Sequence, residues 1–364
     1  MLTVGVEEEF LLLRPDGVVA PVGPDVVRLA DAGGCVTPEY MAYQLETHTS
    51  VCTRLADLRT ELADLRMRAA RGAERAGEVR LVATGAAPFA AGHLDALTDN
   101  ARYRQLAQRF PHATAAGGTC ACQVHVGVPD RDLAVTVLAR LRPWLPTLLG
   151  LTVNSPFAAG ADSGWASCRY RAQLRWPTFR PPEPWPDAER YDHVVHSLIR
   201  SGAAMDPAGV YFLARLSARY PTVEVRVGDT CLTTDEAVMF AGVVRTLVAA
   251  LIDDIERGVC GVRMPTAAVN ANLMAAAQHG MREPASRGSI RPETMPFHVA
   301  RLLAKIAPFL DATGDADDVY AGLDRLLRSG TGADRQRLLW ARAAGPHEFV
   351  AALADATVPV AAVS

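Results

Sequence analysis

Three consecutive glutamates, Glu7, Glu8 and Glu9, lie within an otherwise apolar stretch that runs from Val4 to Leu13. Side chains alternate between the two faces of a strand, so Glu7 and Glu9 point to one side and Glu8 points to the other. Carboxylates at alternate positions are roughly 6–7 Å apart at the backbone, and a shared divalent cation would relieve their repulsion. A solvated strand face explains the same pair, because antiparallel sheets often expose one face to water. Glu8, on the apolar face, is expected to be structural.

Three later segments repeat this alternation of an apolar face with an acid or a histidine on the opposite face. The polar positions are Glu46 within 41–47, His125 within 118–130, and Glu224 with Arg226 within 221–229. One such strand means little, since histidines and acid–base pairs are often structural. Four in one chain predict that the polar faces meet in a concave sheet, whose apolar face packs under helices.

Acids gathered on such a face need compensation, because each buried carboxylate raises the pKa of its neighbours. Divalent cations would provide it, and carboxylate oxygens with one imidazole suit Mg²⁺ or Mn²⁺ better than structural zinc. Arg226, together with Arg169, Arg171 and Arg175, could bind anions. Cations beside arginines indicate a phosphate site, although ordinary surface charge also explains the last three arginines.

The composition excludes several classes of partner. The chain has 364 residues, is 49% apolar and has a net charge of −3, so it can bury a large core and shows no basic patch for nucleic acid. Lys305 is the only lysine and lies outside a G-x-x-x-x-G-K-[ST] frame, which excludes that phosphate-binding loop. No uncharged apolar run is about 20 residues long, so no membrane span is predicted. Seven scattered cysteines without a signal peptide predict reduced thiols in the cytoplasm.

Two rival metal-binding patterns are weaker. Cys120 and Cys122 lack a second cysteine pair at zinc-site spacing, and His193 and His196 share a helix face without a third ligand nearby. We therefore expect the cysteines to be structural and the histidines to lie at the surface.

Helical periodicity surrounds the predicted strands. It covers 54–77, then 130–151 with Asp130 as the cap, then a helix capped by Thr233 or Thr234 with Glu236 in its first turn, and further helices within 261–364. Segment 154–182 has no clear period and is expected to be a long ordered loop. We expect one domain over 1–364, with a strand-rich portion that carries the site (1–260) and a helical C-terminal portion (261–364).

Six blocks in matching order resemble the bacterial carboxylate–amine ligases related to glutamate–cysteine ligase. They are Val4–Phe10, Gln44–Glu46, Val124–Asp130, Asn154–Phe157, Arg175–Thr178 and Pro221–Val227. The resemblance implies an α+β, glutamine-synthetase-like fold, in which a curved antiparallel sheet forms a funnel with helices on its outer face, commonly in a homodimer. It also implies ATP with Mg²⁺ or Mn²⁺, and an amide made through an acyl phosphate from an amino acid, such as glutamate through its γ-carboxyl, and cysteine or another amine.

By this resemblance, the metal ligands would be Glu7, Glu9, Glu46, His125 and Glu224. Arg226 would contact the transferred phosphoryl group, Arg226 and Glu46 would be the catalytic residues, and Arg169, Arg171 and Arg175 would bind substrate or phosphate. Two departures stand out: Gln123 replaces a histidine, and Leu273–Gly280 lacks both arginines of a Trp-Arg-Ala-x-Arg-x-Gly block. A metal-dependent hydrolase of an amide or phosphoester, and a non-catalytic binding protein descended from a ligase, remain alternatives.

Overall fold

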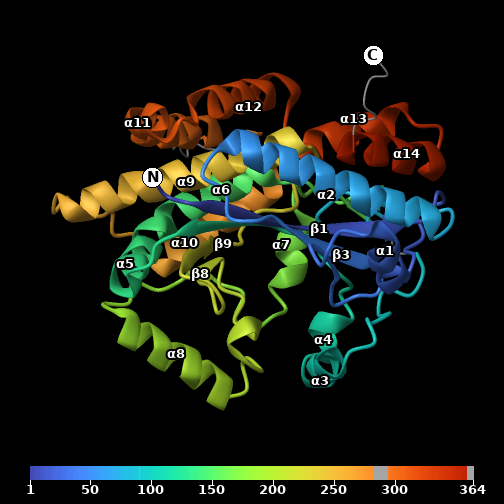
Figure 1. Ribbon diagram of the computed structural model, residues 1–364, viewed down its shortest axis with the longest axis horizontal. Coiled ribbons are helices and arrows are strands. Elements are labelled where there is room, and N and C mark those ends of the chain that lie inside the picture. Colours follow the sequence, from blue (N-terminus) through green and yellow to red (C-terminus); the bar gives the residue numbers. More distant parts are fainter. Residues whose placement is uncertain (90, 283–293, 359–364) are drawn as a thin grey trace.

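The computed structural model describes residues 1–89, 91–282 and 294–358. Its centre is an antiparallel sheet with the strand order β2-β3-β1-β5-β9-β8, and β4 pairs with the end of β1 (Figure 1). The strands of this sheet are β1 (Val4–Leu13), β2 (Val36–Pro38), β3 (Gln44–His48), β4 (Arg80–Val82), β5 (Cys122–Gly127), β8 (Ala214–Leu216) and β9 (Thr222–Val225). A separate ribbon pairs β6 (Phe157–Ala158) with β7 (Ala161–Asp162). The four predicted strands that carry polar faces are thus confirmed.

Helices cover one face of the sheet in two layers. Figure 1 shows α2 and α9 next to the sheet, with α11 to α14 outside them. The helices over the described residues are α1 (Gly23–Ala30), α2 (Leu55–Arg75), α3 (Ala101–Arg109), α4 (Pro111–Thr114), α5 (Arg131–Leu141), α6 (Leu145–Thr152), α7 (Cys168–Gln173), α8 (Ala188–Arg200), α9 (Thr234–Glu256), α10 (Thr266–His279), α11 (Met295–Thr313), α12 (Ala316–Ser329), α13 (Gly332–Arg342) and α14 (Pro346–Thr357). The predicted α+β fold, a curved antiparallel sheet with helices on its outer face, is confirmed.

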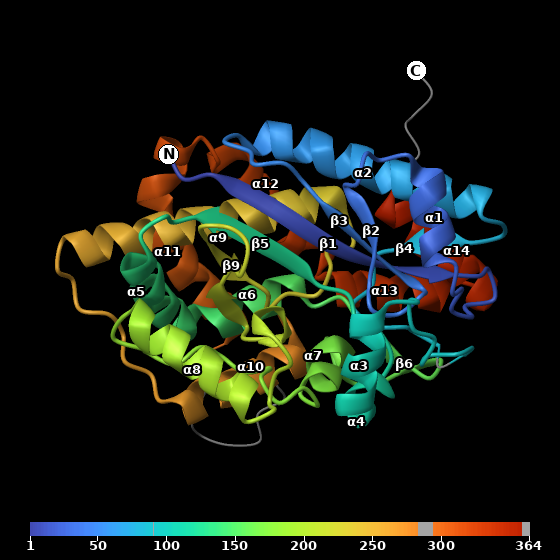
Figure 2. The same cartoon turned by 60° about the horizontal axis from the view of Figure 1, so that its bottom comes forward.

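The opposite face of the sheet is the one that carries the predicted site. Helices α3, α4, α7 and α8 and the β8–β9 hairpin lie on this side, as the turned view in Figure 2 also shows. The residues of this polar face line a cavity.

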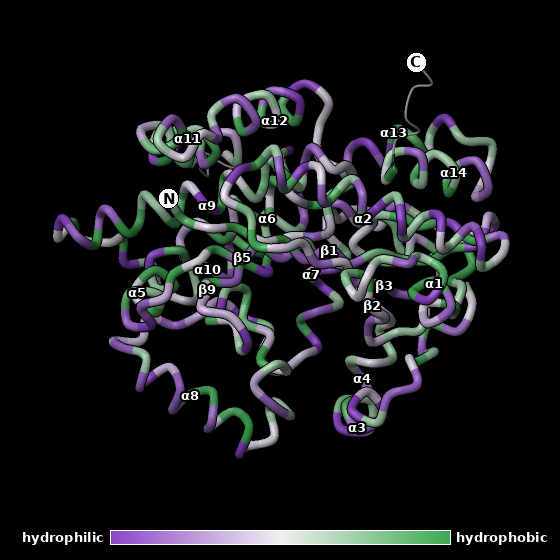
Figure 3. The backbone as a smooth tube through the Cα atoms, viewed as in Figure 1, coloured by the Kyte–Doolittle hydropathy of each residue, from purple (hydrophilic) through white to green (hydrophobic). Residues whose placement is uncertain are grey.

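Helix α9 lies between the sheet and the outer helices and is apolar around most of its circumference. Its residues from Ala237 to Val248 are buried, and its C-terminal end is hydrophilic (Figure 3). A helix that is apolar all round is typical of a position inside the core. The predicted cap is confirmed, since Thr233 and Glu236 form a reciprocal capping box at its start.

The helix predicted over 130–151 is present as α5, a short 3₁₀ turn (Arg142–Trp144) and α6, and Asp130 caps its start. The expectation of a loop throughout 154–182 was wrong, because α7 forms within it. Ser167 starts α7 by accepting a hydrogen bond from the Tyr170 backbone N–H. Six helical residues are too few to show a period in the sequence.

Glu8 is structural, as its position on the apolar face predicts. Its carboxylate is fully buried and accepts two hydrogen bonds from Arg66 of α2, from Nε at 3.0 Å and from Nη2 at 2.5 Å. Arg66 also donates to the carbonyl oxygens of Cys231, Leu232 and Thr357. The pair thus links the first strand to α2 and to the last described helix.

All seven cysteines lie in the described ranges and are free thiols. Along those ranges, no helix combines the length and the apolar character that crossing a membrane requires.

Candidate functional site

The register of the sheet brings the predicted site residues into one row across neighbouring strands. Glu9 of β1 pairs with Glu46 of β3, and Glu7 pairs with Gln123 of β5. His125 of β5 in turn pairs with Glu224 of β9. Residues directly opposite each other in an antiparallel sheet have side chains on the same face. The alternation seen in four separate segments therefore produces one continuous polar surface.

This polar surface is the floor of a cavity of about 260 Å³, here called the acidic cavity. It is lined by acids (Glu7, Glu9, Glu39, Glu46, Glu224), arginines (Arg102, Arg169, Arg215, Arg219, Arg226) and polar or aromatic residues that include Tyr40, Gln44, Tyr103, Gln123, His125, Trp176, Tyr211 and Tyr220. All five predicted metal ligands and Arg226 are thus brought together.

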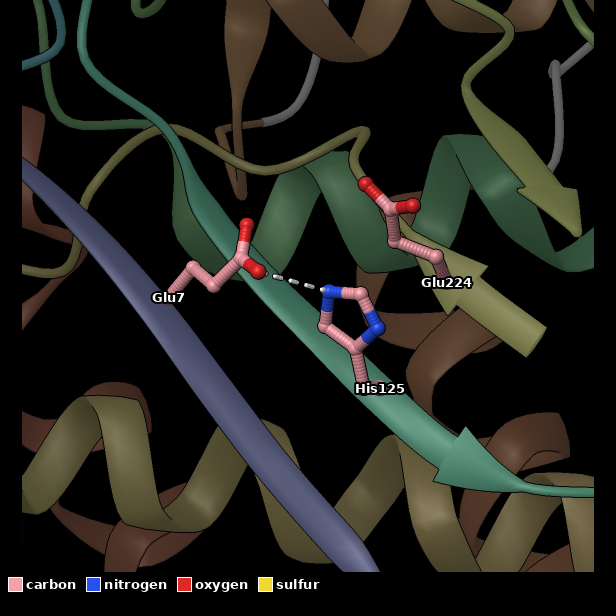
Figure 4. Close-up of side chains that lie close together, drawn as sticks. All are labelled: Glu7, His125 and Glu224. Atoms are coloured by element: carbon pink, nitrogen blue, oxygen red, sulfur yellow. Dashed lines mark ion pairs between the residues drawn. The ribbon is translucent and has the colours of Figure 1, made fainter. Parts of the chain in front are cut away.

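Glu7, His125 and Glu224 form the tightest group in the acidic cavity (Figure 4), since one potential ligand atom from each lies within 4.8 Å of the others. His125 Nδ1 lies 3.0 Å from Thr222 Oγ1, and Nε2 lies 3.3 Å from a Glu7 carboxylate oxygen. Nε2 is buried and has no hydrogen-bond partner in the described structure. With Nδ1 as the donor to Thr222, the Nε2 lone pair faces carboxylates. A divalent cation fits this arrangement, because it would bind the Nε2 lone pair together with the facing carboxylate oxygens.

Glu9, Glu39 and Glu46 form a second acidic group. Burial raises the pKa of each carboxyl. Repulsion from Glu9 raises the pKa of Glu39 further, to about 7, and repulsion from Glu39, Glu7 and Glu9 raises that of Glu46. The Glu9 carboxylate accepts hydrogen bonds from the Ala121 backbone N–H at 2.8 Å and from Gln123 Nε2 at 2.7 Å. Sequence reasoning missed Glu39, because a single acid in the bend between β2 and β3 belongs to no periodic pattern.

Glu224 is held by two arginines. Arg215 of β8 donates to both of its carboxylate oxygens, at 2.8 and 3.1 Å, and Arg226 donates to one of them. Burial alone would raise the pKa of Glu224, but Arg215 and Arg226 outweigh burial and hold it well below its usual range. Sequence reasoning also missed Arg215. Its place between two apolar residues, Ala214 and Leu216, was the available signal, but β8 has only three residues.

Gln123 stands where the related ligases are expected to have a histidine. Its side-chain N–H₂ donates to Glu9, and its oxygen accepts a hydrogen bond from Arg226. An amide can serve both partners at once because it has a donor end and an acceptor end. Gln123 therefore connects the second acidic group to Arg226.

The three arginines of segment 154–182 separate into two places. Arg169 is buried at the acidic cavity and donates to the backbone oxygens of Arg226 and Val227, both at 3.1 Å. Arg171 stacks on Trp165, with 4.7 Å from its guanidinium carbon to the ring centre, and lines a neighbouring cavity with Arg175. Residues 117–119 line both cavities.

The block without the expected arginines lies elsewhere. Ala275 and Ala276 of α10 line a different, mainly apolar cavity of about 430 Å³, and Gln278 is exposed. Neither Ala275 nor Gln278 is among the described residues that line the acidic cavity. The departure therefore leaves the acids and the arginines of that cavity in place.

Comparisons with known proteins agree with this geometry. The family model described as glutamate–cysteine ligase family 2 matches residues 3–353. Relatives named "Putative glutamate–cysteine ligase 2-2" are 41% identical over 360 residues in Mycobacterium sp. (strain KMS), with 98% of both chains covered, and 40% identical over 363 residues in Mycolicibacterium vanbaalenii, again with 98% of both covered.

Two solved structures share the fold at 15% identity. One is a glutamate–cysteine ligase from Francisella tularensis in complex with AMP, with a TM-score of 0.71 over 97% of this chain and 87% of that chain. The other is a bifunctional glutathione synthetase from Pasteurella multocida, with a TM-score of 0.70 over 97% of this chain and 52% of that chain. The whole-chain match to the family model and the close relatives place the chain in glutamate–cysteine ligase family 2.

Proposed function

We propose that the protein is an ATP-dependent carboxylate–amine ligase that joins an amino acid, such as glutamate through its γ-carboxyl, to cysteine or another amine. The observation that carries this proposal is the gathering of five glutamates around one cavity with His125, whose Nε2 faces Glu7 without a hydrogen bond, and with Arg226, which donates to Glu224. Membership of glutamate–cysteine ligase family 2 gives the reaction class. We propose a single ligase domain over 1–364 that works in the cytoplasm as a homodimer.

The acids would hold divalent cations in two groups. Glu7, His125 and Glu224 would hold one, and Glu9 and Glu46, with Glu39, would hold another. Oxygen-rich ligand sets of this kind suit Mg²⁺, with Mn²⁺ as the alternative. When bound, such cations neutralise phosphate oxygens and so favour phosphoryl transfer.

Arg226 would bind the transferred phosphoryl group, and its hydrogen bonds to Glu224 and Gln123 hold the guanidinium in place before substrates arrive. The substrate carboxylate would take the γ-phosphoryl group of ATP with release of ADP, and the amine would then displace phosphate from the acyl carbon. Positioning and charge neutralisation carry such a reaction, and no protein nucleophile is needed. We propose that Glu46 is also catalytic and acts beside the transferred phosphoryl group.

The arginines of segment 154–182 would have separate roles in binding. Arg169 would fix the end of β9 and add positive charge to the floor of the acidic cavity. Arg171 and Arg175 would bind a carboxylate or phosphate in the neighbouring cavity.

A screen of amino acids and amines, with ATP and Mg²⁺, tests the proposal by ADP release and by the mass of the product. We expect ADP to form only when both an acid and an amine are present, and the product mass to equal their sum less one water. A Glu224→Gln variant should lose this activity. Hydrolysis of an amide or phosphoester without an amine would instead support the metal-dependent hydrolase, and nucleotide binding without any turnover would support the binding protein.

A further inference from the structure

The arginines that line the acidic cavity differ in what they contact. Four of them are committed to protein partners: Arg102 to Asp206, Arg169 to two backbone oxygens, and Arg215 and Arg226 to Glu224. Arg219 lies at the tip of the β8–β9 hairpin and its side chain is exposed. Among the described residues, no hydrogen bond or ion pair involves its guanidinium group. Its donors are therefore available to a ligand.

The hairpin tip that carries Arg219 is an ordered turn. The hydroxyl oxygen of Ser217 accepts hydrogen bonds from the backbone N–H groups of Arg219 and Tyr220, both at 3.3 Å. The Ser217 backbone N–H donates to the backbone carbonyl oxygen of Thr222 at 3.1 Å, which closes the hairpin. The position of residue 219 at the cavity edge is thus fixed by the backbone, while its long side chain can reach inward.

The tip stands next to the Glu7, His125 and Glu224 group. The ring of Tyr220 meets the imidazole of His125 edge-on, with 6.1 Å between the ring centres. The aromatic side chains of Tyr40, Tyr103 and Tyr211 instead gather near Glu39 and Glu46, whose charges act on Tyr103. Arg219 therefore lies at the end of the acidic cavity that holds Glu7, His125 and Glu224.

The type and place of this side chain indicate its ligand. A guanidinium group binds phosphate oxygens through paired N–H donors, and a cation at the edge of a cavity attracts an incoming polyanion. We propose that Arg219 binds the phosphate chain of the nucleoside triphosphate as it enters the acidic cavity. This rests on the proposed ligase function and adds a nucleotide-binding residue to it. A substrate carboxylate offers similar chemistry, and the KM values for the carboxylate substrate and for ATP distinguish the two ligands.

The test compares Arg219→Ala with Arg219→Lys and with Arg190→Ala, which removes an exposed arginine of α8 that does not line the cavity. Calorimetric titration with a non-hydrolysable ATP analogue and Mg²⁺ measures nucleotide affinity without turnover. We expect affinity about tenfold weaker for Arg219→Ala, since a charge-assisted contact is lost. Arg219→Lys should recover part of this loss, because the charge remains without the paired donors. Arg190→Ala should bind like the wild type.

Two further readouts separate binding of phosphate from a structural role. The affinity of the wild type should fall with ionic strength more steeply than that of Arg219→Ala, because one exposed charge contact is missing in the variant. Mg²⁺ binding without nucleotide should be unchanged in Arg219→Ala.

Equal nucleotide affinity in wild type and Arg219→Ala would overturn the inference and leave the proposed function standing. So would a rise in the KM for the carboxylate substrate without a change for ATP, since that would make Arg219 a carboxylate contact. A wild-type protein that bound no nucleotide would overturn both proposals.

Discussion

Substitution of Glu8 and of Glu7 by glutamine should affect different properties, although the two residues are neighbours in sequence. Glu8 is fully buried and accepts two hydrogen bonds from the equally buried Arg66. Glu8→Gln would leave the Arg66 charge without a counter-ion, and breaking a buried pair in this way costs about 3–5 kcal/mol. Arg66 would keep its bonds to three backbone oxygens, so we expect the lower end, about 3 kcal/mol of unfolding free energy.

Glu7→Gln removes a carboxylate whose side chain is 24% exposed and which faces the cavity. Its effect on the free energy of unfolding should be smaller, about 1 kcal/mol, because the side chain is partly exposed and an amide can still contact His125. Its effect on Mg²⁺ affinity should be large, on the order of a hundredfold, because a charged ligand is lost.

Urea unfolding in the presence of a chelator and calorimetric titration of Mg²⁺ measure the two effects separately. The double variant Glu8→Gln/Arg66→Met should recover part of the stability lost in Glu8→Gln, since the unpaired buried charge is gone. The assignment of faces along β1 would be refuted if Glu8→Gln kept full stability and lost Mg²⁺ binding.

Three other predictions concern the charges around the site. Burial and neighbouring carboxylates raise the pKa of Glu39 to about 7, from 4.5 for the free side chain. The cation-free protein should therefore gain about 1–3 kcal/mol of stability as the pH falls from 8 to 5.5. Urea unfolding measures this gain, which should disappear in saturating Mg²⁺. Gln123→Leu should lower kcat by about 10- to 100-fold with little change in the KM for ATP, because Arg226 loses an oriented partner. Arg215→Leu should raise the pKa of Glu224, because Arg226 alone would then oppose the effect of burial. The Mg²⁺ affinity of this variant, measured between pH 5 and 8, should therefore depend more on pH than that of the wild type.

The strands and their polar faces could be predicted because the side-chain period of a strand is short and regular. Ten residues of β1 are enough to show which glutamates share a face, and the predicted bounds agree with the structure. Glu39 and Arg215 escaped prediction because they lie in a bend and in a three-residue strand, where no period can be read. Their roles depend on the partners that the fold brings to them, which are distant in sequence or on the next strand.

The arginines show a different limit. Arg169, Arg171 and Arg175 look equivalent in the sequence, since each is a cation in the same short segment. The single turn of α7 and the residues after it direct Arg169 into the acidic cavity, and Arg171 and Arg175 into the neighbouring one. Side-chain direction within a short helix follows from where the helix starts, and that start depends on the Ser167 cap.

The register of the sheet and the geometry of the site are a single constraint. Glu46 lies opposite Glu9, and His125 lies opposite Glu224, so a slip of one residue between two of these strands would move one partner to the helix-covered face. Such a slip at β1 would also move Glu8 away from Arg66, its hydrogen-bond donor on the helix-covered face. Breaking the Glu8–Arg66 pair costs free energy, and this cost disfavours the slip of β1 that would separate the acids of the site. The middle glutamate of the triplet, which has no part in the proposed chemistry, thus helps to fix where Glu7 and Glu9 point.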